Sequence, residues 1–401
     1  TGEYANIQWR AVDMEHLRQH PLYRSLPLSA EVRLNNAQSL GLFRQGTWQW
    51  DALHSGRLTT SKLACCLGFY ESSTASVLDI PKSLQSHSRA VLAWKQLCAS
   101  PIKDYSTLLQ ACDEIPLVGY LSSAWSAVPV DEGTTEKSIF PFIFTPIPSN
   151  IPMYDSLYSD PMSVRLAWGS AQEATAVLAA LNYFHGINPG VVVHESGIDI
   201  TAYLYDTIYK WIHNEKSLPL LGASPDGTIE YPDGTIEVLE VKCVSPYITR
   251  KFNTHTHTKN ILGLMSGYGG RSHSSSSSSS SSFGVWHIPQ LQWEMLCVGA
   301  HCRSAVIVIL SIQGARLFRV QRDDQYILKM LEYIKVFYTT YISHVPSNKR
   351  KPPQPNFFHT NNKKYLEFLN YTKEINKNTI LIKELNNKEI QRNPYNTEFF
   401  I

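Results

Sequence analysis

Acidic and basic residues recur in one short segment of this sequence, LGASPDGTIEYPDGTIEVLEVKC at 221–243. Its second Pro-Asp-Gly predicts the turn of an antiparallel hairpin centred near Asp233. Asp226 and Glu240 are equidistant from that centre, so the hairpin sets them opposite each other. Directly opposed residues have Cβ atoms about 4.5–5.5 Å apart. We therefore expect these two carboxylates to lie side by side.

Two ionised carboxylates this close repel each other unless a cation lies between them. A hard divalent cation, Mg²⁺ with Mn²⁺ as a substitute, prefers such oxygen ligands. Side chains alternate along a strand, so Lys242 shares a face with Glu240 while Val241 points away. Carboxylates that hold Mg²⁺, together with a lysine that orients water or stabilises developing charge, suit phosphodiester hydrolysis.

Each part of this pattern also has an ordinary explanation. An acid-x-Lys triplet on a strand is usually a solvated edge, and Pro-Asp-Gly is usually only a turn, which is the role we expect for Asp233. The register match between Asp226 and Glu240 is what favours a catalytic site.

The residues around the hairpin predict the elements that must hold it. A helix from about 164–184 has apolar residues at helical spacing, and β-branched residues at 191–193 predict a strand. After the hairpin come a helix near 287–299, strands at 304–310 and 315–320, and a helix with an apolar stripe from Ile327 to Tyr341. This order predicts an α/β fold, a mixed central β-sheet flanked by helices.

Composition divides the chain into three parts. Residues 1–44 are an N-terminal segment, 45–345 the main domain and 346–401 an Asn- and Lys-rich tail. Within the main domain, residues 70–160 contain scattered Pro, Ser and Gly, and we expect an insertion there. The block 253–282 ends in nine serines, which bury no apolar surface, so we expect a flexible loop.

The overall composition is that of a folded protein, with 43% of the 401 residues hydrophobic. The net charge of +2 means that any DNA-binding surface must be local. The seven cysteines form no Cys-x-x-Cys pair, which favours a reducing intracellular location and leaves nucleus and cytoplasm open. No apolar run could span a membrane. The motifs HExxH, GxxxxGK[ST] and GxSxG are absent, which argues against zinc proteases, P-loop proteins and serine hydrolases.

Several segments, in this order, resemble the PD-(D/E)xK nucleases, and specifically the branch of phage lambda exonuclease and the YqaJ-type viral recombinases. They are GRLTTSKLACCLG at 56–68, WGSAQEATAV at 168–177, GASPDG at 222–227, LEVKC at 239–243, PQLQWEMLCVG at 289–299 and DDQYILKMLEYIKVFY at 323–338. The resemblance covers about 45–70 and 161–343 and implies a restriction-endonuclease-like core.

The resemblance also implies roles for the acidic and basic residues. Asp226 and Glu240 would be metal ligands, with the Val241 carbonyl as a third. Lys242 would be the catalytic lysine, and Glu173 an outer carboxylate that supports a second metal. Glu173 has an ordinary explanation too, because the helix dipole favours an acid near a helix N-terminus.

Two glutamines match the family's glutamine helix. Gln290 is the better candidate for a hydrogen bond to an active-site carboxylate or water, and Gln292 would contact DNA. The alternative is that both are surface amides of the helix.

Residues 56–61 match the family's element for the terminal phosphate of a DNA strand, with Arg57, Thr59 and Ser61 as its ligands. Hydroxyls and free backbone N–H groups at a helix start suit a phosphate. The alternative is plain N-capping by Thr60 or Ser61. The family commonly has a second arginine where this chain has His54, which makes 5′-phosphate binding weaker or pH-sensitive.

Taken together, the resemblance implies a Mg²⁺-dependent exonuclease that degrades one strand of duplex DNA from its end, 5′ to 3′, in recombination, repair or viral-type DNA processing. It also implies a homo-oligomeric ring, a trimer in the family, and a single-strand annealing protein as partner. An endonuclease or nickase on the same core stays open, as does a catalytically silent DNA-binding recombination protein. The filled acidic and basic positions favour an enzyme.

Overall fold

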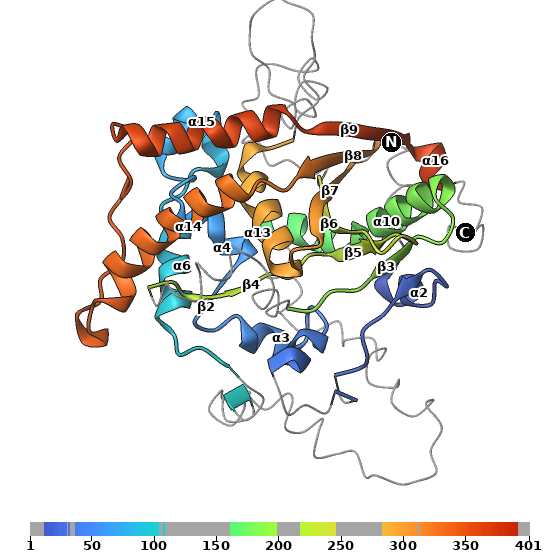
Figure 1. Cartoon of the computed structure of the whole chain (residues 1–401), viewed down its shortest axis with the longest axis horizontal. Helices are drawn as coiled ribbons and strands as arrows, with labels where there is room; N and C mark the ends of the chain where they lie inside the picture. The colour runs from blue at the N-terminus through green and yellow to red at the C-terminus, as the bar shows by residue number, and fades with distance from the viewer. Residues whose placement is uncertain are drawn as a thin grey trace, which may run out of the picture.

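The computed structural model describes residues 12–29, 31–32, 37–103, 107–108, 161–198, 217–245, 283–311 and 313–391. A mixed sheet runs through the middle of this part of the chain (Figure 1). Across the sheet, its strands are β1 (Tyr23–Arg24), β3 (Val192–His194), β5 (Gly227–Glu230), β6 (Ile236–Cys243), β7 (Cys302–Ser311), β8 (Gly314–Gln321) and β9 (Ile380–Asn386). Neighbours are antiparallel except β1 with β3 and β6 with β7. Helices flank this sheet, so the α/β class expected from the sequence is confirmed.

Strands β5 and β6 form the expected hairpin in the expected register. Gly227 is opposite Leu239, which centres the hairpin on residue 233. Asp233 closes the turn, because its carboxylate accepts a 2.9 Å hydrogen bond from the backbone N–H two residues later. Continued by one residue, this register sets Asp226 against Glu240.

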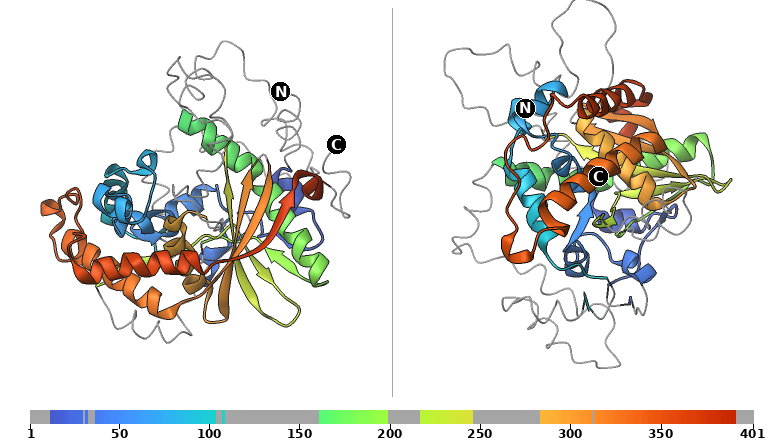
Figure 2. Two further views of the ribbon diagram at one scale, coloured as in Figure 1. Left: turned by 90° about the horizontal axis from the view of Figure 1, so that it is seen from above. Right: turned by 60° about the vertical axis from the view of Figure 1, so that its left-hand side comes forward.

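Helices cover both faces of the sheet (Figures 1 and 2). On one face lies α10 (Pro161–Ile187), and on the other lie α4 (Thr60–Cys66), α13 (Ile288–Val298) and α14 (Asp324–Tyr338). Alternate residues of β6 divide between the two cores, since Leu239 and Val241 join the α10 core and Val238 joins the α13 core. Glu240 and Lys242 have the parity of Val238, so they face α13.

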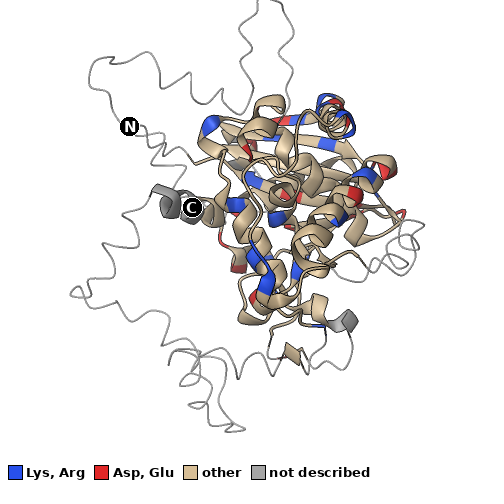
Figure 3. Cartoon of the chain, turned by 90° about the vertical axis from the view of Figure 1, so that its left-hand side faces the viewer, with Lys and Arg blue, Asp and Glu red and all other residues tan. Residues whose placement is uncertain are grey.

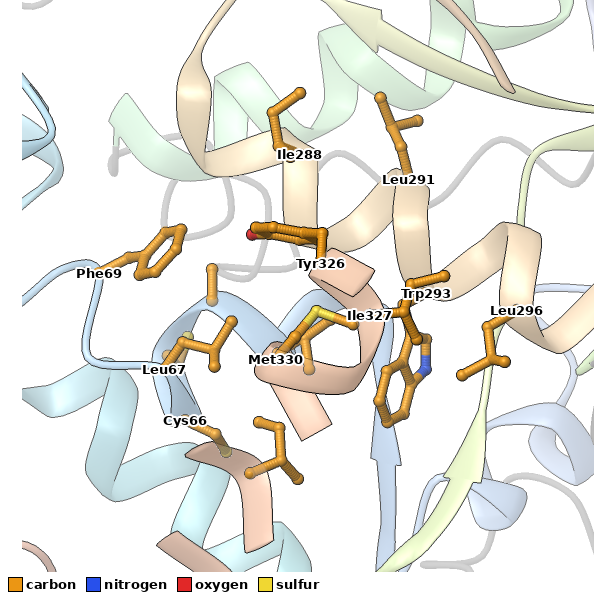
Figure 4. Close-up of a cluster of buried hydrophobic side chains, with 14 of the residues drawn as sticks. Cys66, Leu67, Phe69, Ile288, Leu291, Trp293, Leu296, Tyr326, Ile327 and Met330 are labelled. Carbon is orange, nitrogen blue, oxygen red and sulfur yellow. The ribbon is translucent and has the colours of Figure 1, made fainter. Parts of the chain in front are cut away.

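Helix α13 lies at the centre of the larger core. Its Ile288, Leu291 and Trp293 pack with Tyr326 and Met330 of α14, and all five side chains are fully buried (Figure 4). Fully burying a large apolar side chain contributes roughly 1.5–3 kcal/mol, so this contact fixes α13 firmly. The same helix reaches β6 with a polar side chain.

Residues 346–391 belong to the core, which corrects the expected tail. α15 (Lys363–Lys377) packs on α14, and β9 extends the sheet by pairing with β8. Tyr365, Phe368 and Leu369 of α15 are at most 1% exposed. Their spacing is that of one helical face, a pattern hidden by the Asn and Lys content of the segment.

The expected insertion at 70–160 is corrected in its first part. α5 (Ser72–Val77) and α6 (Ser88–Cys98) contribute buried residues to the core that contains α4 and α13. Residues 109–160 of that insertion lie outside the described residues, as does the serine-rich block 253–282.

The N-terminal segment is also part of the domain. β1 pairs in parallel with β3, and α2 (Met14–Arg18) packs against α10. Arg18 of α2 forms an ion pair of 2.6 Å with Glu195, directly after β3. The boundary expected at residue 44 therefore does not separate two units.

The remaining elements are short. They are the helices η1 (Ala37–Leu42), α3 (Trp48–Leu53), η2 (Lys82–Leu84), η7 (Val285–His287), η8 (Thr339–Ser343), η9 (Ser347–Lys349) and α16 (Asn387–Gln391), and the strands β2 (Arg57–Thr59) and β4 (Leu220–Gly222). β2 and β4 pair in parallel as a separate small sheet. None of the helices in the described ranges has the length and hydrophobicity of a membrane span.

Candidate active site

The open end of the β5–β6 hairpin brings Asp226, Glu240 and Lys242 together. Asp226 Oδ2 accepts a hydrogen bond of 2.6 Å from the N–H of Val241, which ties the start of β5 to β6. Lys242 Nζ donates to Glu240 Oε1. The Val241 side chain is buried in the opposite core, so only its backbone can take part in the site.

Helix α13 adds two further polar residues. Gln290 Nε2 donates to Glu240 Oε1, the contact with an active-site carboxylate that the sequence favours for this residue. The same nitrogen donates to Glu294 Oε1 at 2.9 Å. Sequence reasoning missed Glu294, although an acid one turn after Gln290 in an otherwise apolar helix was a usable signal.

The carboxyls of the site interact strongly. Burial raises the pKa of Asp226 well above its ordinary value, and the charges of Glu240 and Glu173 raise it further. Burial alone would lower the pKa of Lys242, but the carboxylates of Glu240 and Asp226 raise it above its ordinary value. Lys242 is therefore a stable cation in the middle of the acids and not a proton acceptor at neutral pH.

Glu173 reaches the site from α10, on the other face of the sheet. Its side chain is half-buried, and burial together with the charge of Glu240 raises its pKa, while Lys242 lowers it. Glu173 therefore lies within electrostatic range of Glu240 and Lys242. The expected four residues, Glu173, Asp226, Glu240 and Lys242, thus lie in one neighbourhood.

The oxygen atoms of Asp226 and Glu240 determine whether a divalent cation fits this site. Glu240 is 2% exposed, and its Oε2 is a buried oxygen without a hydrogen-bond partner among the described residues. Within the described ranges, no group of three or more His, Cys, Asp or Glu side chains is arranged to hold a metal ion. Mg²⁺ is usually bound by one or two carboxylates, with waters and substrate phosphates as its other ligands. Asp226 with the free oxygen of Glu240 fits that pattern.

The structure corrects the role expected for Arg57. Arg57 is 3% exposed, and its guanidinium donates to the carbonyls of Leu53, Ile102 and Leu221 at 2.8–3.1 Å. It therefore ties β2 to its surroundings and does not face a DNA phosphate.

The other two expected phosphate ligands, Thr59 and Ser61, differ in their exposure. Thr59 is 3% exposed, and its Oγ1 accepts a hydrogen bond of 3.2 Å from Gln96, so it too faces the interior. Thr59 is also the N-cap residue of α4, without a side-chain cap hydrogen bond. Ser61 is exposed in the first turn of α4, where a phosphate could reach it.

The structure also corrects the role expected for Gln292, a contact with DNA. Its side chain is fully buried, with Nε2 donating to the carbonyl of Gln321 at 2.7 Å and Oε1 accepting from the N–H of Asp323 at 2.8 Å. It joins α13 to the start of α14 and has no surface to offer to DNA.

His54 lies beside the residues that hold the loop leading to Asp226 through hydrogen bonds. Its Nδ1 is 2.8 Å from the carbonyl of Trp50, and burial lowers the pKa of His54. Trp50 Nε1 donates to Ser224 Oγ at 2.9 Å, and Gln45 Nε2 donates to the carbonyl of Pro225 at 3.1 Å. α3 and the residues before it therefore hold the backbone just ahead of Asp226.

Basic side chains near this site were missed by sequence reasoning. The Arg89 guanidinium lies 4.3 Å from the centre of the Tyr70 ring. Burial raises the pKa of Tyr70 to about 12, and the charges of Arg89 and Lys242 act against it. Burial raises the pKa of the Cys65 thiol to about 11, and the charges of Lys62 and Arg89 act against this increase. Tyr70 thus lies within electrostatic range of both Arg89 and Lys242. Figure 3 shows Lys and Arg positions on several elements of the face that it presents.

No known family model matches this sequence, and no curated protein is significantly similar to it.

Proposed function

We propose that this protein is a Mg²⁺-dependent deoxyribonuclease that hydrolyses one strand of duplex DNA from its end, in the 5′ to 3′ direction. The observation that carries the proposal is the hairpin register, which sets Asp226 against Glu240 with Lys242 on the same face. The hydrogen bond from Gln290 to Glu240 supports it. Polarity, the ring-shaped assembly and an annealing partner follow from the sequence resemblance and stay predictions.

Each residue has a defined part in the proposed reaction. Asp226 and Glu240, with the Val241 carbonyl, would hold Mg²⁺, which polarises the phosphate and activates water when bound. Lys242 presents a fixed positive charge to the developing negative charge on the phosphate. Glu173 adds negative charge from α10 that favours binding of cations.

The test is digestion of linear duplex DNA labelled at one end, beside closed circular DNA, with Mg²⁺ or with a chelator. We expect Mg²⁺-dependent loss of the linear form alone, and release of the 5′ label before the 3′ label. Lys242→Met and Asp226→Asn should abolish cleavage. Asp233→Asn is the matched control on the same hairpin and should cleave like the wild type.

Other results would select the alternatives. Cutting of the circular form would assign an endonuclease or nickase to the same site. DNA binding without cleavage in Mg²⁺ or Mn²⁺ would assign a catalytically silent recombination protein. Full activity of Asp226→Asn would overturn the site itself.

A further inference from the structure

Glu294 is a fully buried acid that the proposed reaction does not use. It lies in α13 at 0% exposure, and no residue that the structure describes forms a hydrogen bond with its Oε2. Burial of a carboxyl oxygen without a partner opposes folding. An apolar residue would pack at this position without that penalty, so the carboxyl calls for another explanation.

The contact of Glu294 with Gln290 determines how Gln290 is oriented. Gln290 Nε2 donates both to Glu294 Oε1 and to Glu240 Oε1, so one nitrogen serves two carboxyls. A side-chain amide can turn over and exchange its nitrogen and oxygen. A reversed Gln290 would place its oxygen against two acceptor oxygens, which is unfavourable. Two acceptors therefore fix one orientation where a single acceptor would fix it less firmly.

The orientation of Gln290 in turn affects Glu240. Glu240 Oε1 receives both Gln290 Nε2 and Lys242 Nζ, which together hold the carboxylate in one rotation. The other oxygen, Oε2, has no hydrogen-bond partner within the described ranges. The chain of contacts from Glu294 through Gln290 thus ends on the oxygen that is free to bind a cation.

We infer that Glu294 is a positioning residue, which orients the Gln290 amide and thereby keeps Glu240 Oε2 directed toward a divalent cation. Its effect on cleavage rests on the proposed function. The arrangement of the three side chains, and its effect on cation binding, do not depend on DNA being the substrate.

Two substitutions separate the hydrogen bond from the volume of the side chain. E294Q keeps an acceptor oxygen at nearly the same size, whereas E294M keeps the size and removes the acceptor. We expect E294M to weaken binding of Mn²⁺ alone, measured by titration calorimetry, by about 10- to 100-fold, the usual effect of losing a group that orients a metal ligand. The kcat for end-labelled duplex should fall to a similar extent with little change in KM. E294Q should stay within a few-fold of the wild type.

A double substitution tests whether Glu294 acts through Gln290. In the Q290M background, E294M should have no further effect on Mn²⁺ binding, because the amide that it orients is gone. Effects that multiply, or an E294M protein that binds Mn²⁺ like the wild type, would overturn the inference. E294A serves as a second variant without the acceptor, and thermal unfolding reports whether each protein folds. Failure of both E294M and E294A to fold would also overturn it, since the role would then be structural.

The outcomes distinguish this inference from the proposed function. Suppose that the wild type cleaves no DNA, but that its Mn²⁺ affinity depends on Glu294 through Gln290. This result would contradict the proposed nuclease function and support the positioning role of Glu294. A wild type that cleaves DNA, together with an equally active E294M protein, would support the nuclease function and contradict the positioning role.

Discussion

Asp226 stands out among the side chains of the site for its electrostatic environment. Burial and the charges of Glu240 and Glu173 raise its pKa, and Lys242 offsets this only in part. The folded protein therefore keeps a proton on Asp226 at pH values where the unfolded chain would release it. Such a group destabilises the fold once it must ionise.

Removal of this charge should stabilise the protein. Asp226→Asn should raise the free energy of unfolding at pH 7 in the presence of a chelator, by about 1.4 kcal/mol for each unit of the pKa increase. Because the folded pKa of Asp226 is raised, its contribution is fully present below the ordinary pKa near 4 and is lost as pH rises through the folded value. Wild-type stability should thus fall with pH more steeply than that of the variant in urea unfolding.

The exposed turn of the same hairpin provides the control. A hydrogen bond from the N–H of Thr235 lowers the pKa of Asp233. Asp233→Asn should therefore not stabilise the protein at pH 7. An Asp226→Asn protein that is less stable than the wild type would contradict the electrostatic account.

Replacement of Arg57 is expected to lower the stability of the protein. Arg57→Met leaves three backbone carbonyls without their donor, so the free energy of unfolding should fall by about 3–5 kcal/mol. Arg89→Met, with its guanidinium stacked on Tyr70, should change stability by less than about 1 kcal/mol. Urea unfolding compares the two. Unchanged stability of Arg57→Met with weakened DNA binding would restore the phosphate role.

At the scale of elements, α15 forms an aromatic layer over α14. The ring of Phe368 stacks on that of Tyr326 with centroids 5.3 Å apart, and Tyr333 lies 5.0 Å from Phe368. This layer covers the core that fixes α13, the helix that carries Gln290. The site is therefore stabilised from a segment distant in sequence.

The contribution of α15 can be measured with one pair of variants. Phe368→Ala should lower the free energy of unfolding by about 3–5 kcal/mol because it removes a buried ring. Leu366→Ala, at 36% exposure on the same helix, should lower it by less than about 1 kcal/mol. Equal effects of the two substitutions would mean that α15 does not depend on this layer.

Elements fixed by local pattern could be predicted, and those fixed by long-range packing could not. The β5–β6 register follows from a turn and from alternation within one hairpin, so the sequence contains all of it. β9 and α15 escaped prediction because a polar composition masks a narrow apolar face. The burial of Arg57 and Gln292 depends on partners up to 164 residues away, which no local pattern reports.

At the scale of the whole molecule, the proposed function requires a surface that attracts DNA despite a net charge of only +2. Lys62 on α4 and Arg89 on α6 both act on the pKa of Cys65, and Arg89 and Lys242 both act on the pKa of Tyr70. In the part of the chain that the structure describes, neither forms an ion pair with a carboxylate. We expect these two cations to contact phosphates if duplex DNA binds at the proposed site.

This placement predicts how salt affects DNA affinity. Lys62→Gln and Arg89→Gln should each weaken duplex binding and reduce the slope of log affinity against log salt by about 1. Lys383→Gln is a suitable control, because Lys383 lies on β9 and pairs with Glu389 at 3.0 Å. Fluorescence anisotropy over a range of salt concentrations gives the slopes. Equal slopes for all three variants would place the DNA elsewhere.

Strand β9 also bears on how copies of this chain can associate. Among the described strands it lies at one border of the sheet, and a border strand can pair with another molecule. Its sequence, ILIKELN, places Lys383 and Glu384 in the middle of that border, and charged side chains there discourage edge-to-edge aggregation. We therefore expect that a ring built from this protein would not continue the sheet through β9 from one copy to the next.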